Sequence, residues 1–173
     1  YVDNVTGGGG AIGLREATKA APDGYTVLGL VTNSTIGPFT IKNFPTSDTY
    51  EPLCLVATDP TTFAVKADSR FKTLQEFIKY SKDHSGELTT ANAGTGGANY
   101  LATAAFLDAA GIKLTMIPYK GSAPAIVAAM GGHVDSVTAG CSEVLNYVEG
   151  KKLKPLATFS AKRSRLFPDV PTA

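Results

Sequence analysis

Short apolar or β-prone runs alternate along this chain with segments that favour helices. The short runs predict strands, and they cover residues 25–31, 53–57, 62–66, 88–92, 114–118, 134–138 and 153–158. Leu74, Phe77 and Ile78 recur at helical spacing and predict a helix over residues 74–84, and further helices fit between the strands at residues 11–20, 98–110, 123–131 and 142–149. This alternation of strands and helices predicts an α/β fold with mainly parallel strands.

Local signals at the ends of these segments support the assignment. Thr73 and Glu76 have the spacing of a capping box, in which each side chain satisfies a backbone donor of the other residue, so a helix should begin at Leu74. Gly150 follows the last predicted helix, where a glycine commonly ends a helix. The run Tyr25–Val31 is almost continuously apolar, which is typical of a strand covered on both faces.

The segment from Leu88 to Ala110 is the most informative part of the chain. A β-prone run leads into a turn of small residues, Ala93–Ala98, and then into a strong helix former. Such a turn leaves several backbone N–H groups free at a helix N-terminus, where the helix dipole also favours negative charge. The turn contains no charged, histidine or cysteine side chain. It is therefore predicted to bind an anion without reacting with it.

Two further loops that follow predicted strands, Thr32–Thr35 and Ala139–Ser142, are also small and polar. Because ligands bind beyond the carboxyl ends of the strands in open α/β sheets, all three loops are candidates for one carboxylate site. The alternative is that small polar residues after strands serve only to form turns. The candidate ligand-binding residues are Asn33, Ser34, Thr35, Ala93, Gly94, Thr95, Gly96, Gly97, Ala98, Asn99, Gly140 and Cys141.

Composition narrows the classes of function. The 173 residues are 43% hydrophobic and 18% charged, as in folded globular proteins. The net charge of +1 argues against a nucleic-acid partner, which would need a clustered basic excess. No apolar stretch approaches the ~20 residues of a membrane span.

No catalytic, metal or cofactor motif is complete. Residues Gly8–Gly13 match G-x-G-x-x-G, but the next predicted strand leads into Val31–Ser34 without the acidic residue that a dinucleotide site needs. We interpret these glycines as the turn that opens a helix at Ala11. His84 and His133 are isolated from other ligating or catalytic residues. The sequence therefore predicts a binding protein with no metal and no cofactor, and not an enzyme.

The two cysteines, Cys54 and Cys141, lie far apart and lack the spacing of a metal or redox site. Both are surrounded by apolar or small residues, so we expect free, buried thiols. A disulfide between them stays open as the alternative.

Several motifs occur in the order found in one protein family. They are Asn4–Gly13, Ala21–Thr26, Ala93–Gly96, Ile117–Pro124, Gly131–Asp135, Ser160–Ser164 and Phe167–Thr172. With this ordered set the chain resembles, over essentially its whole length, the Bug (TctC-like) solute-binding proteins of tripartite tricarboxylate transporters.

This resemblance implies a type II periplasmic-binding-protein fold with two lobes and mainly parallel sheets. Residues 1–58 would form part of lobe 1, which is incomplete in this chain, and residues 59–173 would form most of lobe 2. The ligand would be a small di- or tricarboxylate, held between the lobes and delivered to a membrane permease. The protein would be periplasmic, although the chain contains no signal peptide.

The resemblance also assigns roles to two loops. Gly94–Asn99 matches the turn with which the second lobe holds the ligand, and Thr32–Thr35 matches a first-lobe loop that faces the cleft. Tyr100 replaces a histidine that is common in the family, and Gly97 stands where serine is common. These departures leave the identity of the carboxylate open.

Two other classes of function stay open at this point. The effector-binding domain of a LysR-like transcriptional regulator shares the fold, but it would accompany an N-terminal helix-turn-helix, of which the chain shows no sign. An enzyme on the same fold would need convergent acid–base groups at the strand ends.

Overall fold

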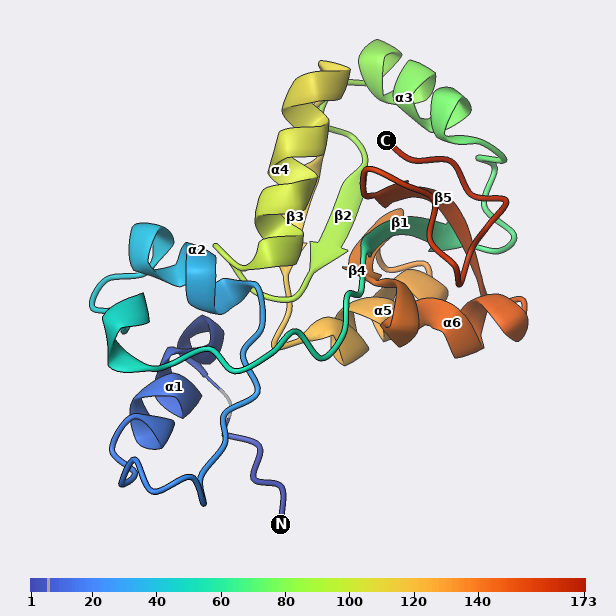
Figure 1. The fold of residues 1–173 in the computed structure, drawn as a ribbon. Helices are drawn as coiled ribbons and strands as arrows, with labels where there is room; N and C mark the ends of the chain where they lie inside the picture. The colour runs from blue at the N-terminus through green and yellow to red at the C-terminus, as the bar shows by residue number, and fades with distance from the viewer. Residues whose placement is uncertain (6) are drawn as a thin grey trace. The chain divides into compact units, whose positions relative to one another are not determined.

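The structure, a computed structural model, describes residues 1–5 and 7–173. Contacts divide the chain into two compact units. Figure 1 shows the chain coloured by residue number, from blue at the N-terminus to red at the C-terminus. The first unit comprises Tyr1–Val56 with the short segment Thr95–Ala98, and the second comprises Ala57–Gly94 and Asn99–Ala173. Each unit has hydrophobic clusters of its own.

The second unit is built on one five-stranded sheet in the order β3-β2-β4-β1-β5. Its strands are β1 (Thr61–Lys66), β2 (Thr89–Asn92), β3 (Thr115–Pro118), β4 (Ser136–Gly140) and β5 (Leu153–Phe159). β2 pairs in parallel with β3 and β4, whereas β1 is antiparallel to both β4 and β5. The predicted α/β class is confirmed, and the sheet is mixed because β1 runs against the other strands.

The second unit has four α-helices, and the sequence predicted all of them. They are α3 (Leu74–Asp83), α4 (Ala98–Ala110), α5 (Ser122–Met130) and α6 (Cys141–Glu149). At the start of α3, the Thr73 hydroxyl accepts a hydrogen bond from the Glu76 amide at 3.2 Å, as expected of a capping box. The Glu76 carboxylate accepts from the amide of Lys72, at 2.6 Å, instead of that of Thr73.

Alternation along β1 divides the core of this unit into two layers, one on each face of the sheet. Phe63 belongs to one layer and packs with Phe77 of α3 and Phe106 of α4. Ala64 belongs to the other layer, together with Ile126 of α5. Helices α3 and α4 therefore cover one face, and α5 and α6 cover the opposite face (Figure 1).

The first unit is helical and has a small core. Its elements are η1 (Gly8–Gly10), α1 (Ala11–Ala17), α2 (Asn33–Thr40) and η2 (Ser47–Thr49). The expected glycine turn that opens a helix at Ala11 is confirmed. The buried cluster consists of Ala11, Leu14 and Phe44.

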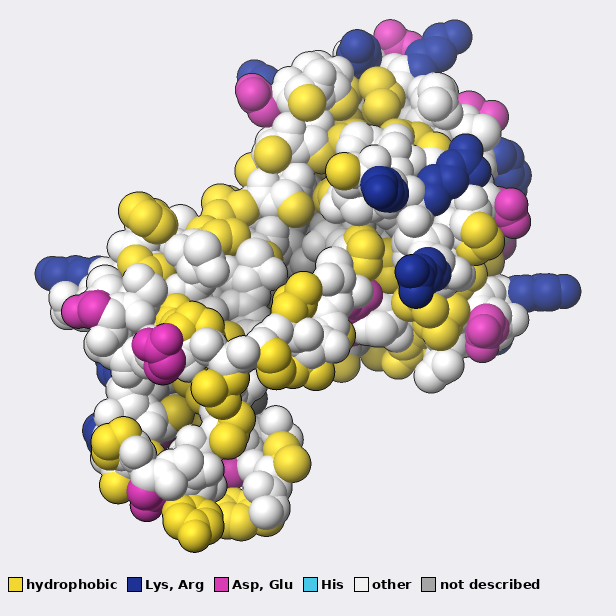
Figure 2. All heavy atoms as spheres, viewed as in Figure 1, with side chains coloured by type: hydrophobic (Ala, Val, Ile, Leu, Met, Phe, Trp, Pro, Cys, Tyr) yellow, Lys and Arg dark blue, Asp and Glu magenta, His cyan; other side chains and the backbone are white. Residues whose placement is uncertain are grey.

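The strands predicted over Tyr25–Val31 and Leu53–Ala57 are wrong. Both segments are irregular chain without strand pairing, and Tyr25 and Val56 are 92% and 91% exposed. A strand is stable only where neighbouring strands satisfy its backbone and a packed layer covers its apolar side. Nothing within the described residues pairs with these two segments. Hydrophobic side chains consequently lie on the surface of this unit (Figure 2).

The two thiols have opposite environments. Both cysteines are free, with Cys141 buried and Cys54 exposed. The prediction of a buried free thiol is confirmed for Cys141. It is wrong for Cys54, because Cys54 lies in the same exposed run as Leu53 and Leu55.

We expect a thiol reagent to label Cys54 in the native protein and Cys141 only after unfolding. Cys54 is open to solvent. Burial raises the pKa of the Cys141 thiol and keeps it protonated, against the opposing effect of a hydrogen bond with Ser164. The measurement is labelling stoichiometry with and without denaturant. Cys54→Ser should abolish the native reaction, and rapid native labelling of that variant would contradict the burial of Cys141.

Candidate functional site

The chain turns sharply between β2 and α4. Gly94 and Gly96 have positive φ values of 83° and 76°, in the left-handed region that glycine adopts without strain. The Gly94 amide donates to the carbonyl of Asn92 at 3.0 Å, which closes the first part of the turn. The two glycines of this predicted turn are therefore required by its backbone conformation.

The turn contains a row of unpaired amides. Those of Thr95, Gly96 and Gly97 donate no hydrogen bond to any atom of residues 1–5 and 7–173. The next amide, that of Ala98, donates to Asn33 Oδ1 at 2.7 Å, in a contact within the first unit. The dipole of the 13-residue helix α4 adds partial positive charge at this end. Three successive free N–H groups at a helix N-terminus are suited to bind an anion.

A chain of hydrogen bonds in the second unit fixes the base of the turn. Asn92 Nδ2 donates to Thr103 Oγ1 at 3.1 Å, and the Thr103 hydroxyl donates to the Asn99 carbonyl at 2.7 Å. Thr61, the first residue of β1, donates through its hydroxyl to Asn99 Oδ1 at 3.0 Å. These side chains hold the first turn of α4 against the sheet.

Three residues of this hydrogen-bonded network, Thr61, Asn92 and Thr103, were not among the predicted site residues. The spacing of Asn99 and Thr103, at i and i+4 on one helix face, was an available signal for Thr103. No local pattern marks Thr61, because it reaches Asn99 only through the tertiary fold.

The predicted loop at Thr32–Thr35 is wrong, because Asn33 begins helix α2. Asn33 Nδ2 donates to the Gly9 carbonyl at 3.2 Å, and its Oδ1 accepts from the turn. The Ser34 side chain is buried and its hydroxyl donates to a carbonyl three residues earlier, whereas Thr35 is exposed. Asn33 is therefore the residue of this group that contacts the turn.

The N-terminus of α6 carries the other predicted residues, Gly140 and Cys141. The Gly140 amide donates to Glu143 Oε2 at 2.7 Å, and the Cys141 amide donates at 2.9 Å to a carbonyl of the segment before β1. Asp59, in that same segment, accepts from the amide and the hydroxyl of Ser142 at 3.0 and 2.5 Å. A Cβ at position 140 would collide with the Asp59 carboxylate. The protein's own carboxylates thus occupy this helix terminus, unlike that of α4.

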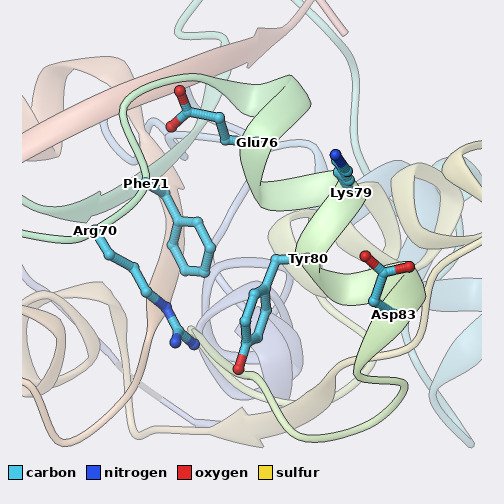
Figure 3. Close-up of a pocket in the computed structure, with 6 residues that line it drawn as sticks. All are labelled: Arg70, Phe71, Glu76, Lys79, Tyr80 and Asp83. Atoms are coloured by element: carbon cyan, nitrogen blue, oxygen red, sulfur yellow. The ribbon is translucent and has the colours of Figure 1, made fainter.

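A separate groove of about 300 Å³ lies beside α3 (Figure 3). Its lining residues are Arg70, Phe71, Glu76, Lys79, Tyr80 and Asp83. The Arg70 guanidinium lies over the Tyr80 ring, 3.8 Å from its centroid, and 4.9 Å from the centroid of Phe71. Acidic and basic side chains line the same groove, so it does not favour an anionic ligand.

Two other features are absent from the described part of the chain. No three His, Cys, Asp or Glu side chains gather there in a way that could hold a metal ion. None of the described helices combines the length and the apolar character that crossing a bilayer requires.

Comparison with known proteins identifies relatives over the whole chain. The family model described as "Tripartite tricarboxylate transporter family receptor" (TctC) matches residues 1–173. A Cupriavidus necator protein, described as "UPF0065 protein in gbd 5'region", is 36% identical over 172 residues, which are 99% of this chain and 52% of that protein. The chain spans about half the length of the relatives it matches.

Solved structures are similar as well. A TctC solute binding protein from Polaromonas, without ligand, is 34% identical, with a TM-score of 0.76 over 98% of this chain and 58% of that chain. MatC from Rhodopseudomonas palustris, with bound malate, is 27% identical, with a TM-score of 0.81 over 96% of this chain and 57% of that chain.

Proposed function

Because this chain belongs to the TctC family of tripartite tricarboxylate transporter receptors, we propose that it forms part of a periplasmic protein that binds a small di- or tricarboxylate. The carboxylate would bind at the turn Thr95–Gly97 and be delivered to the membrane permease of the transporter. The observation that carries this proposal is the row of three free amides at the N-terminus of α4. The malate bound to the Rhodopseudomonas protein supports the choice of a carboxylate.

Neutral donors suit the capture and release of a carboxylate. A hydrogen bond to a charged group contributes roughly 1.5–3 kcal/mol, so two or three amides can hold the ligand without a permanent counter-charge. The turn Ala93–Asn99 contains no charged, histidine or cysteine side chain that could act as an acid or a base. The ligand would therefore leave chemically unchanged, as transport requires.

The receptor would have two lobes, with residues 1–58 in one and residues 59–173 in the other. The ligand would bind between them and stabilise a closed arrangement through contacts that only this arrangement makes. The alternative with the same expected fold is the effector-binding domain of a LysR-like regulator. The match to the receptor family over residues 1–173 favours the transport function.

The proposal is tested by following the backbone amide signals of the whole receptor, of which this chain would form part, by NMR while malate, adipate or citrate is added. We expect the signals of Thr95, Gly96 and Gly97 to shift saturably, because a bound carboxylate accepts hydrogen bonds from these amides. Sodium chloride at equal ionic strength is the control. Unchanged turn signals, or equal shifts with chloride, would contradict the proposal.

Gly94→Val should abolish carboxylate binding, whereas Gly86→Val should leave it intact. Both glycines have positive φ, 83° and 80°, and an added Cβ would meet nothing within 4 Å at either position. The two substitutions therefore impose similar backbone strain. Gly86 precedes β2 and Gly94 follows it, so only the side chain at position 94 blocks the approach of a ligand to the turn.

Isothermal titration calorimetry with the carboxylate that shifts the turn signals measures both affinities. Thermal denaturation of the two variants shows whether their stabilities match. Equal loss of binding at positions 86 and 94 would indicate that strain, and not access to the turn, decides the affinity.

A further inference from the structure

Three buried oxygens on the sheet lack a protein partner. They are Thr90 Oγ1 and Asn92 Oδ1 of β2 and Thr138 Oγ1 of β4. All three residues are 0% exposed. A buried polar atom without a partner is costly, and native proteins rarely carry several of them together.

The register of the sheet places these residues on one face of two neighbouring strands. β2 and β4 are parallel neighbours in which Thr90 pairs with Ser136, so continuing the register sets Asn92 opposite Thr138. Because side chains alternate along a strand, Thr90, Asn92 and Thr138 share one face. Thr138 also pairs with Phe63, which packs against α3 and α4. The three oxygens therefore lie in the layer between the sheet and these two helices.

Hydrogen bonding determines which atom of the Asn92 amide is left without a partner. The Thr103 hydroxyl has one proton, which it donates to the Asn99 carbonyl. It can therefore meet Asn92 only as an acceptor, and Asn92 must present Nδ2 to it, at 3.1 Å. The acceptor Oδ1 is consequently the atom that needs another donor.

We propose that Thr90, Asn92 and Thr138 form a binding site for one internal water molecule between the sheet and α4. A water molecule donates two hydrogen bonds and accepts two, so it can donate to Asn92 Oδ1 and also serve threonine hydroxyls as donor or acceptor. Buried waters typically make about three hydrogen bonds to polar groups that otherwise lack a partner. The site supplies three such atoms. The water would join β2 and β4 at the base of the turn that precedes α4.

Thr138→Val tests this site, because valine has the shape of threonine without its hydroxyl. With the water bound, the variant removes one of its partners, and the melting temperature should fall by about 3–6 °C. Without the water, valine removes an unpaired buried hydroxyl, and the melting temperature should stay the same or rise. A constant or higher melting temperature would overturn the proposal.

Thr62→Val is the matched control. Thr62 is also 0% exposed, and its hydroxyl donates directly to the Ala157 carbonyl at 2.8 Å. Removal of the Thr62 hydroxyl should lower the melting temperature by a similar amount. The control therefore measures how far the melting temperature falls when one buried hydroxyl hydrogen bond is lost.

A crystal structure of the unmodified protein, at a resolution that shows ordered solvent, gives a result that does not depend on any variant folding. We expect density for a water within hydrogen-bond distance of Asn92 Oδ1 and Thr138 Oγ1. The absence of that density would overturn the proposal. Neither experiment involves a carboxylate, so the outcome is independent of the proposed transport function.

Discussion

Phe63→Ala should lower the free energy of unfolding by about 3–5 kcal/mol. Phe63 is 0% exposed, and its ring centroid lies 5.0 Å from that of Phe77 and 5.4 Å from that of Phe106. Phe159 of β5 completes the cluster at 6.4 Å. Alanine would leave a cavity among three rings that are held by three different elements, so the surroundings cannot close it by a local shift.

Urea unfolding followed by circular dichroism measures this loss, and Phe39→Ala is the matched control. The Phe39 side chain is 88% exposed, so its truncation should change the free energy of unfolding by no more than about 0.5 kcal/mol. Equal losses in the two variants would contradict the placement of Phe63 in the core.

Backbone amides in the strands of the second unit should exchange with deuterium about 1000-fold more slowly than those of the first unit, a difference of about 4 kcal/mol. The buried cluster of the first unit consists of Ala11, Leu14 and Phe44. The sheet of the second unit is covered on both faces by buried side chains. Opening the first unit therefore exposes far less apolar surface, and it should open without unfolding the second.

Exchange followed by mass spectrometry resolves the two units, because their peptides differ. Peptides from β1 and β5 should stay protected when peptides from α1 and Tyr25–Val31 have exchanged fully. A sample exchanged in urea provides the fully deuterated reference. Equal protection in the two units would contradict this expectation.

The sequence predicted the elements of the second unit well for a physical reason. Each apolar run of that unit has a neighbouring strand and a covering helix within the described chain, so its local pattern and its environment agree. The antiparallel direction of β1 could not be predicted in the same way, since a run such as Thr61–Lys66 has the same pattern in either direction.

The first unit shows the opposite case. Tyr25–Val31 has the pattern of a buried strand, yet its side chains are largely exposed because no described segment pairs with it. Helix α2 was missed because Asn33–Thr40 contains Gly37 and Pro38, which are poor helix formers. A strand pattern therefore indicates that a segment can form a strand when neighbouring strands pair with it. The pattern does not indicate whether such strands are present.

The candidate site was predictable in part. The backbone conformation of the turn at 93–98 could be predicted from its small residues and from the helix that follows. Glycine in the left-handed region and the start of a helix both have local sequence signatures. The contacts of Thr61 with Asn99 and of Asn33 with Ala98 join residues far apart in the chain, so no local pattern could indicate them.

The exposure of Cys54 gives this protein a natural attachment point for a spectroscopic reporter. A maleimide fluorophore or a nitroxide would couple there without any engineered substitution, because the other thiol is inaccessible in the native state. Such a label on the first unit would allow carboxylates to be screened by fluorescence or electron paramagnetic resonance without any amino-acid substitution.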